Sequence, residues 1–177
     1  FYNTIDPILK TKKWRFALVI ISASALMISF YLAYPQHNQK ARFPGLNVTA
    51  SDISAVEWIN DQNKESDFVV LSNQLVSAAA LQKYSFKKYF NTEKGEQFYY
   101  SIPTGGPLYQ LYGDMLYKGQ KTESMISAMD LVGANKSYFV LNSYWADSDK
   151  IIEGAKKTAE DWHIINDGAV WIFSYER

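Results

Sequence analysis

The chain of 177 residues has no cysteine, only two histidines and no net formal charge at pH 7. The absence of cysteine excludes disulfides, thiolate metal ligands and a cysteine nucleophile, but it leaves the cellular compartment open. The balanced charge gives no reason to expect nucleic acid as a partner, because nucleic-acid-binding domains are usually strongly basic. The first residue is Phe1, so we expect either a processed chain or a piece of a longer protein.

The sequence also lacks the short motifs that mark common catalytic sites. It contains no G-x-S-x-G nucleophile elbow, no phosphate-binding P-loop and no G-x-G-x-x-G dinucleotide fingerprint. The two histidines, His37 and His163, have no partners at metal-ligand spacing, so we expect no metal site. The sequence therefore predicts no cofactor and identifies no catalytic residue.

One stretch near the start is strongly apolar. From Phe16 to Gln39 there is no Asp, Glu, Lys or Arg, and the most apolar part ends near Tyr34. As a helix, about 19 residues span about 28 Å, close to the hydrocarbon thickness of a bilayer. A core helix of a soluble protein would be polar on one face, and a cleaved signal peptide would be shorter and followed by small residues. We therefore predict a transmembrane helix over 14–34.

The charges on either side of this helix predict its orientation. Four basic residues, at positions 10, 12, 13 and 15, precede the helix, and two, at positions 40 and 42, follow it closely. Because the more basic flank of a membrane helix usually stays inside, we expect residues 1–13 in the cytoplasm. Residues 35–48, which are polar and contain proline and glycine, then form a stalk. Residues 49–177 form a domain outside the cell membrane.

The rest of the sequence alternates between short apolar runs and helical patterns. The runs 67–72 and 137–145 indicate buried strands. Asn166-Asp167-Gly168, between two further apolar runs, is a strong hairpin signal. We expect an α/β domain of three layers, with a mostly parallel sheet and a C-terminal antiparallel hairpin. Its helices are expected at 49–61, 73–84, 108–119, 122–134 and 147–162, with a further strand at 97–103.

The loop 104–107, with the sequence Thr-Gly-Gly-Pro, is the strongest candidate for a ligand contact. Glycines permit close approach of the backbone, and free N–H groups at the start of a following helix attract anions such as phosphate. Several tyrosines flank the loop, and tyrosine rings can stack on sugar rings. The alternative is a tight turn with tyrosines that fill a half-buried surface. The predicted ligand-binding residues are Thr104, Gly105, Gly106, Tyr99, Tyr109 and Tyr112.

A second candidate place is the carboxyl edge of the sheet, where ligands of α/β proteins usually bind. The predicted strands end at Ser72 and Asn73 and at Asn142, and Asp147 and Asp149 follow as a possible acid pair. All of these residues also suit helix caps, and acids are expected in a first helical turn because of the helix dipole. Both interpretations stay open at this point.

The segment VTASDISAVEWINDQNKESDFVVLS, after an apolar span and a polar stalk, resembles the C-terminal part of GT-C-type membrane glycosyltransferases and their uncharacterised relatives. The shared pattern is D-x-x-A-x-x-W-I followed by the apolar strand VVL. Asp52, Ala55, Trp58, Ile59 and residues 69–71 carry it here. The resemblance covers residues 14–72 well and the remainder in outline.

The resemblance implies a parent protein with several membrane spans that transfers a sugar from a lipid-linked donor outside the membrane. The catalytic acids of that family lie in loops near the N-terminal spans, which this sequence does not contain, so no catalytic residue is carried over. The segment is then accessory or acceptor-facing, with the lipid bilayer and a lipid-linked sugar or glycan acceptor as partners. The alternative is a single-pass membrane-anchored interaction or structural subunit of an envelope complex, with other envelope proteins as partners.

Overall fold

The computed structural model describes residues 12–33, 45–64, 67–85, 88–93 and 95–177. Outside this range lie residues 1–11, which we expect in the cytoplasm, and residues 34–44, which include the predicted helix end, most of the stalk and His37. The chain divides into two compact units, Phe1–Pro35 and Gln36–Arg177.

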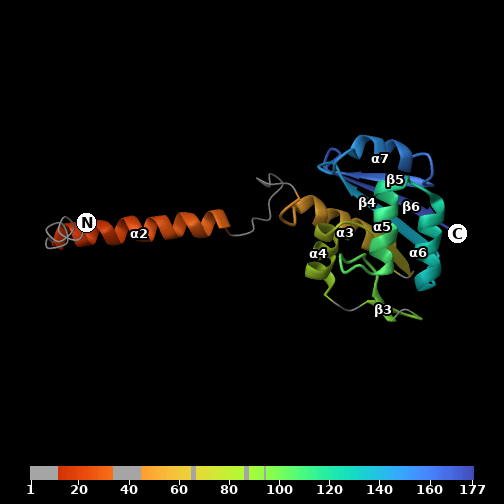
Figure 1. The fold of residues 1–177 in the computed structure, drawn as a ribbon, viewed down its shortest axis with the longest axis horizontal. Coiled ribbons are helices and arrows are strands. Elements are labelled where there is room, and N and C mark those ends of the chain that lie inside the picture. The colour runs from red at the N-terminus through yellow and green to blue at the C-terminus, as the bar shows by residue number, and fades with distance from the viewer. Residues whose placement is uncertain (1–11, 34–44, 65–66, 86–87, 94) are drawn as a thin grey trace. The chain divides into compact units, whose positions relative to one another are not determined.

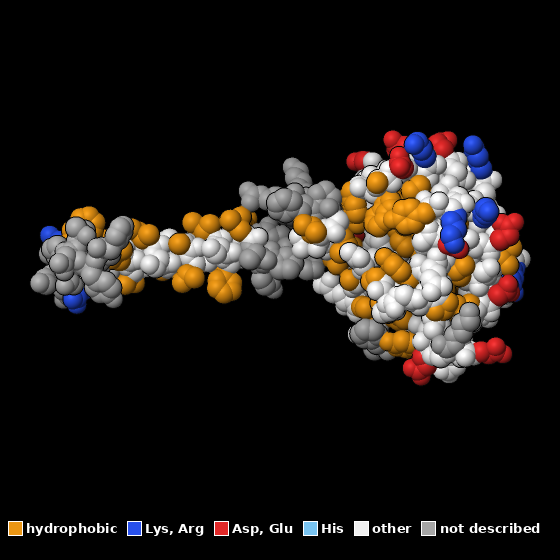
Figure 2. Space-filling view, in the orientation of Figure 1, with side chains coloured by type: hydrophobic (Ala, Val, Ile, Leu, Met, Phe, Trp, Pro, Cys, Tyr) orange, Lys and Arg blue, Asp and Glu red, His pale blue; other side chains and the backbone are white. Residues whose placement is uncertain are grey.

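The first unit contains the helix α2, Lys12–Ala33, which is orange-red in Figure 1. It contains four Ala and three Leu residues, which favour helix, and it has no proline or glycine. Among the described residues it is the one helix long and apolar enough to cross a membrane, and the side chains of Lys13–Leu32 are not buried within the chain. Figure 2 shows apolar side chains along the visible face of this helix. Its candidate span of 20 residues extends about 30 Å.

The second unit is built on a four-stranded sheet with the strand order β1-β4-β6-β5. The strands are β1 (Phe68–Leu71), β4 (Lys136–Asn142), β5 (Asp161–Ile165) and β6 (Val170–Glu176). The strands β1, β4 and β5 run in the same direction, and β6 runs against them between β4 and β5. Tyr100 adds a single parallel bridge to β1. This confirms the expected sheet, which is mostly parallel in direction and has an antiparallel C-terminal hairpin at one edge.

Helices cover both faces of this sheet and make the three expected layers (Figure 1). One face packs against α3 (Ala50–Gln62) and α4 (Gln74–Tyr84). The other face packs against α5 (Pro107–Tyr117), α6 (Thr122–Val132) and α7 (Ser148–Ala155). The fold class is therefore α/β, as the alternation of apolar runs and helical patterns predicts.

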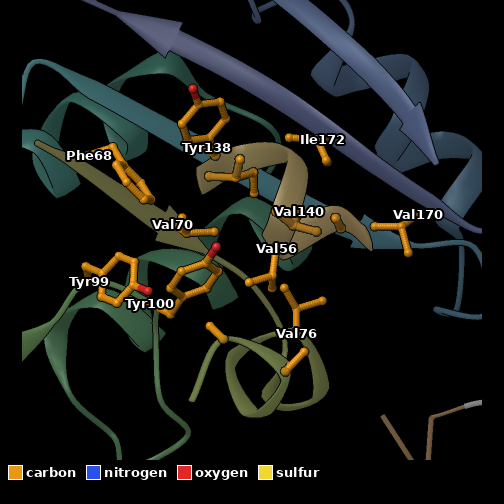
Figure 3. Close-up of a cluster of buried hydrophobic side chains, with 14 of the residues drawn as sticks. Val56, Phe68, Val70, Val76, Tyr99, Tyr100, Tyr138, Val140, Val170 and Ile172 are labelled. Atoms are coloured by element: carbon orange, nitrogen blue, oxygen red, sulfur yellow. The ribbon is translucent and has the colours of Figure 1, made fainter. Parts of the chain in front are cut away.

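The alternation of side chains along each strand divides the interior into two cores. In β1, Val70 faces α3 and α4, whereas Val69 faces the opposite layer of helices. Figure 3 shows the first core, in which Val56 of α3 and Val76 of α4 lie near Val70 of β1 and Val140 of β4. All of these valines are fully buried. Burial on both faces explains why the central strands appear in the sequence as continuous apolar runs.

Two regions differ from the expectation. A small antiparallel hairpin of β2 (Tyr89–Thr92) and β3 (Gly95–Phe98) precedes the bridge at Tyr100, where a single strand over 97–103 was expected. The strand β2 has only four residues and none is buried, so it leaves no apolar run in the sequence. The last helix ends at Ala155 rather than at 162, because Asp161 and the residue after it already pair with β6.

Candidate functional site

The loop 104–107 leads directly into α5. Gly105 has φ +75°, a left-handed conformation that glycine adopts without strain. Gly106 is the N-cap residue of α5 and provides no side-chain cap, and Pro107 follows in the first turn, where its missing N–H is tolerated. The side chain of Gln110 donates from Nε2 to the carbonyl oxygen of Gly105 over 2.9 Å. This bond ties the loop to the first turn of the helix.

The loop borders a cavity of about 150 Å³ between the β2–β3 hairpin and the start of α5. Three of the six predicted ligand-binding residues, Thr104, Gly106 and Tyr109, line this cavity. Gly105 lies between Thr104 and Gly106 in the same loop. The other lining residues are Tyr89, Glu96, Gln97, Phe98, Tyr100, Ile102 and Leu108.

The structure places Tyr99 and Tyr112, the other two predicted residues, on opposite faces of the sheet. Tyr99 is 3% exposed and packs beside Phe68, with 5.4 Å between the ring centroids. Tyr112 is 1% exposed and lies in the other core, 6.0 Å from the ring of Phe139. Burial raises the pKa of Tyr99 to about 12, and burial also raises the pKa of Tyr112 above the usual range. Neither residue lines the cavity, and both rings contribute to packing.

Residues of the β2–β3 hairpin reach the cavity although the sequence did not single them out. Tyr89 comes from β2, and Glu96 and Gln97 come from β3. The turn between the strands is closed by Thr92, whose hydroxyl donates to the carbonyl oxygen of Gly95 over 2.7 Å. Gly95 has φ +93°, which favours glycine, and it is the one sequence signal that could have revealed this hairpin.

The predicted strand ends do meet at the carboxyl edge of the sheet. Asn73 donates from Nδ2 to Asn142 Oδ1 over 2.7 Å, and Asn142 donates from Nδ2 to Asp52 Oδ1 over 2.7 Å. The Asp52 side chain is fully buried, and Asn73 and Asn142 are 3% and 2% exposed. Asn73 also caps α4, because its Oδ1 accepts hydrogen bonds from two backbone N–H groups of the first turn.

Tyr144 closes this edge beside the asparagines. Its hydroxyl accepts a hydrogen bond from Asn73 Nδ2 over 3.0 Å. Burial and the nearby charge of Asp52 raise the pKa of Tyr144, and the hydrogen bond from Asn73 opposes that shift. The ring of Tyr144 also contacts Gly45, where the described part of this unit begins: a Cβ placed on Gly45 would lie 3.2 Å from Tyr144 Cε2.

Three buried serines extend the polar network from the strand end into the chain that follows β3. The backbone N–H of Ser72 donates to Ser101 Oγ over 2.8 Å, and Ser101 Oγ donates to the Ser72 carbonyl oxygen over 2.7 Å. Ser77 Oγ donates to the carbonyl oxygen of Ser101. Because these polar groups bond to one another, this edge is a packed network that joins strands and helix starts. It is not an open ligand site.

The predicted acid pair and the one described histidine, His163, form no metal or catalytic cluster among the described residues. Asp147 and Asp149 lie at the start of α7 and are exposed, and Asp147 pairs with Lys150 over 3.3 Å. The ring of His163 stacks on Trp58, with 4.3 Å between centroids and 5° between planes. Within the described ranges, no three His, Asp or Glu side chains gather closely enough to hold a metal ion.

Comparison with known proteins gives no relative for this chain. No protein family, no curated protein and no solved structure matches it.

Proposed function

We propose that this chain is a membrane-anchored protein in which α2 crosses the bilayer and residues 49–177 form an extracytoplasmic α/β domain. The observation that supports the proposal is the surface of α2. Over Lys13–Leu32 the helix is apolar and about 30 Å long, and none of the described side chains in this range is buried. Such a surface is unfavourable in water, and the hydrocarbon layer of a bilayer matches its length.

The flanking charges support the proposed orientation. The described basic residues Lys13 and Arg15 stand at the start of α2, and its last turn carries no basic residue. Trp14 lies at the same end and Tyr31 lies near the other, as side chains at the two interfaces of a membrane do. In the proposal the N-terminal side faces the cytoplasm and the α/β domain lies outside.

Within this arrangement we assign the α/β domain an accessory, acceptor-facing role in a glycosyltransferase-like membrane protein. The support is the pattern of residues 52–71. Trp58 packs partly buried at the edge of one core, and the strand 69–71 that follows is fully buried. The open cavity beside the loop 104–107 gives the domain a surface for a ligand, and the packed carboxyl edge stabilises the fold.

Two measurements test this function. Membranes that contain the chain are washed with alkaline carbonate, which releases peripheral proteins and retains inserted ones. We expect the chain in the pellet, and release into the supernatant would contradict an anchor. An antiserum against residues 45–177 is then used to measure the size of the native polypeptide. A product much larger than 20.3 kDa supports the glycosyltransferase-like parent, and a product of 20.3 kDa contradicts it.

The alternative function, a single-pass interaction subunit of an envelope complex, is favoured by the edge strand β5. Trp162 and Ile164 are 42% and 44% exposed there, and no described strand pairs with the outer edge of β5. A photo-crosslinking residue at position 162 in native membranes tests it. One discrete protein adduct supports the interaction subunit, and the absence of any protein adduct contradicts it.

A further inference from the structure

We propose that the cavity between the β2–β3 hairpin and the start of α5 binds a single neutral sugar ring. This inference rests on the proposed function, because it names the class of ligand that the acceptor-facing α/β domain would bind. The cavity itself is formed within the α/β domain, from β2, β3, the loop 104–107 and α5.

The lining of the cavity combines aromatic surfaces with polar groups. Six of the ten lining residues are aromatic or aliphatic, and Tyr89 and Tyr109 are the two aromatics among them that remain partly exposed. Their rings offer flat faces to the C–H surface of a sugar, and the hydroxyl of Tyr109 can hydrogen-bond at the rim. Glu96, Gln97 and Thr104 supply the carboxylate, amide and hydroxyl groups that bind sugar hydroxyls.

These polar groups are free to bind a ligand. Among the described residues, the side chains of Glu96 and Gln97 make no hydrogen bond or ion pair, and the Thr104 hydroxyl makes only a long contact of 3.4 Å to the Ile102 carbonyl oxygen. The Thr104 hydroxyl and the Gln97 amide oxygen both lie beside Gly106. A Cβ placed on Gly106 would lie 3.5 Å from Thr104 Oγ1 and 3.9 Å from Gln97 Oε1.

The charge of the lining selects a neutral ligand over a phosphate. Glu96 is the one acidic residue of the lining, and no Lys, Arg or His is among the lining residues. The start of α5 attracts anions, but a helix terminus carries only about half a unit of charge and is weakened by solvent. The full negative charge of Glu96 therefore outweighs the partial positive charge at the start of α5. A sugar with its hydroxyls fits this balance, because a carboxylate accepts hydrogen bonds from hydroxyl groups.

The size of the cavity limits the ligand to one ring. Its volume is about 150 Å³, whereas pockets for drug-sized ligands begin near 300 Å³. The cavity therefore accommodates a monosaccharide or the terminal residue of a glycan, and not several sugars of a chain.

The test uses the full chain, solubilised in a detergent without a sugar headgroup, and saturation-transfer NMR. The probes are the methyl glycosides of glucose, galactose, mannose and N-acetylglucosamine, with inorganic phosphate in a parallel titration. We expect at least one glycoside to bind and phosphate not to bind. Absence of binding by all four glycosides, or displacement of a bound glycoside by phosphate, would overturn the inference.

Two variants and one control localise the binding. Gly106→Val fills the cavity between Thr104 and Gln97, and the backbone of Gly106, with φ −66° and ψ 165°, accepts valine without strain. Glu96→Ala removes an exposed acceptor and is safe for folding. We expect each to weaken glycoside binding at least tenfold. Gly113→Ala, in the same helix with open space around it, serves as the control and should bind as the unaltered chain does.

The results separate this inference from the proposed function. Equal binding by Gly106→Val, Glu96→Ala and Gly113→Ala would place the sugar elsewhere and overturn the inference. A chain that resists carbonate extraction but binds no glycoside keeps its anchor and loses the sugar site. A chain that binds a glycoside at this cavity but is released by carbonate keeps the sugar site and loses the proposed membrane function.

Discussion

Asn142 donates from Nδ2 to Asp52 Oδ1 over 2.7 Å and so joins the end of β4 to the first turn of α3, across 90 positions of the sequence. The other oxygen of the Asp52 carboxylate accepts two hydrogen bonds from Thr49, from its backbone N–H at 2.8 Å and from its hydroxyl at 2.7 Å. One buried carboxylate thus caps α3 and holds that cap against the carboxyl edge of the sheet.

We expect Asp52→Ala to destabilise the domain by about 2–4 kcal/mol. The change removes hydrogen bonds to a charged acceptor, weakens the start of α3 and leaves the Asn142 amide without its acceptor in a buried place. Urea unfolding followed by tryptophan fluorescence measures the loss. Asp61→Ala is the matched control in the same helix, because Asp61 is exposed and forms a solvent-facing pair with Lys64; its effect should stay within about 0.5 kcal/mol. Equal losses for the two variants would contradict the role of Asp52.

Two glycine-to-alanine changes should have opposite effects on stability. Gly168 has φ +90° in the β5–β6 turn, so Gly168→Ala forces alanine into a left-handed conformation and costs about 1–2 kcal/mol. Gly113 lies inside α5 with no atom within 4 Å of an added Cβ, so Gly113→Ala should stabilise the helix by about 0.5–1 kcal/mol. Thermal unfolding followed by near-UV circular dichroism measures both. Effects of the same sign would contradict one of these two backbone conformations.

The domain should lose stability in alkaline solution because of its buried tyrosines. Burial raises the pKa of Tyr99 to about 12 and raises the pKa of Tyr100 and Tyr112 as well. The folded chain therefore keeps these protons at pH values where the unfolded chain, with ordinary tyrosines near 10, has released them. Below about pH 10 the buried tyrosines leave the free energy of unfolding unchanged, because they are protonated in both states. As the pH rises from about 10 towards 12, that free energy falls by at most about 1.4 kcal/mol per pH unit for each tyrosine.

Urea unfolding at several pH values between 9 and 12, beside a spectrophotometric tyrosinate titration, measures this effect. Tyr99→Phe removes one of the late-titrating hydroxyls and should reduce the slope of stability against pH in this interval. Constant stability up to pH 12, or ionisation of every tyrosine while the domain is still folded, would contradict the burial of these hydroxyls.

The sequence predicts those parts of the fold that depend on local signals. The continuous apolar runs at 67–72 and 137–145 became β1 and β4, and the turn 166–168 became the β5–β6 hairpin. Asn73 suits a helix cap in the sequence, and in the structure it is the N-cap of α4. Each of these features is set by the period of apolar residues or by a turn residue with a special conformation.

The candidate site was only partly predictable, because it depends on contacts between distant segments. Thr104, Gly106 and Tyr109 line the cavity as the loop sequence suggested. Tyr99 and Tyr112 are close to the loop in sequence, but they enter two different cores, because Tyr99 lies in the segment after β3 that bonds to β1 and Tyr112 lies on the packed face of α5. Glu96 and Gln97 come from a hairpin whose first strand has no buried residue and so has no apolar signature.

The most direct test of the account is the topology of the chain, and these 177 residues contain no cysteine that would add background labelling. Single cysteines are introduced at Thr11, before α2, and at Lys150, whose side chain is 83% exposed on α7. Intact cells are treated with a membrane-impermeant maleimide. We expect Lys150→Cys to be labelled in intact cells, and Thr11→Cys to be labelled only after the membrane is opened. Labelling of Thr11→Cys alone in intact cells, or protection of both positions, would contradict an α/β domain held outside the membrane by α2.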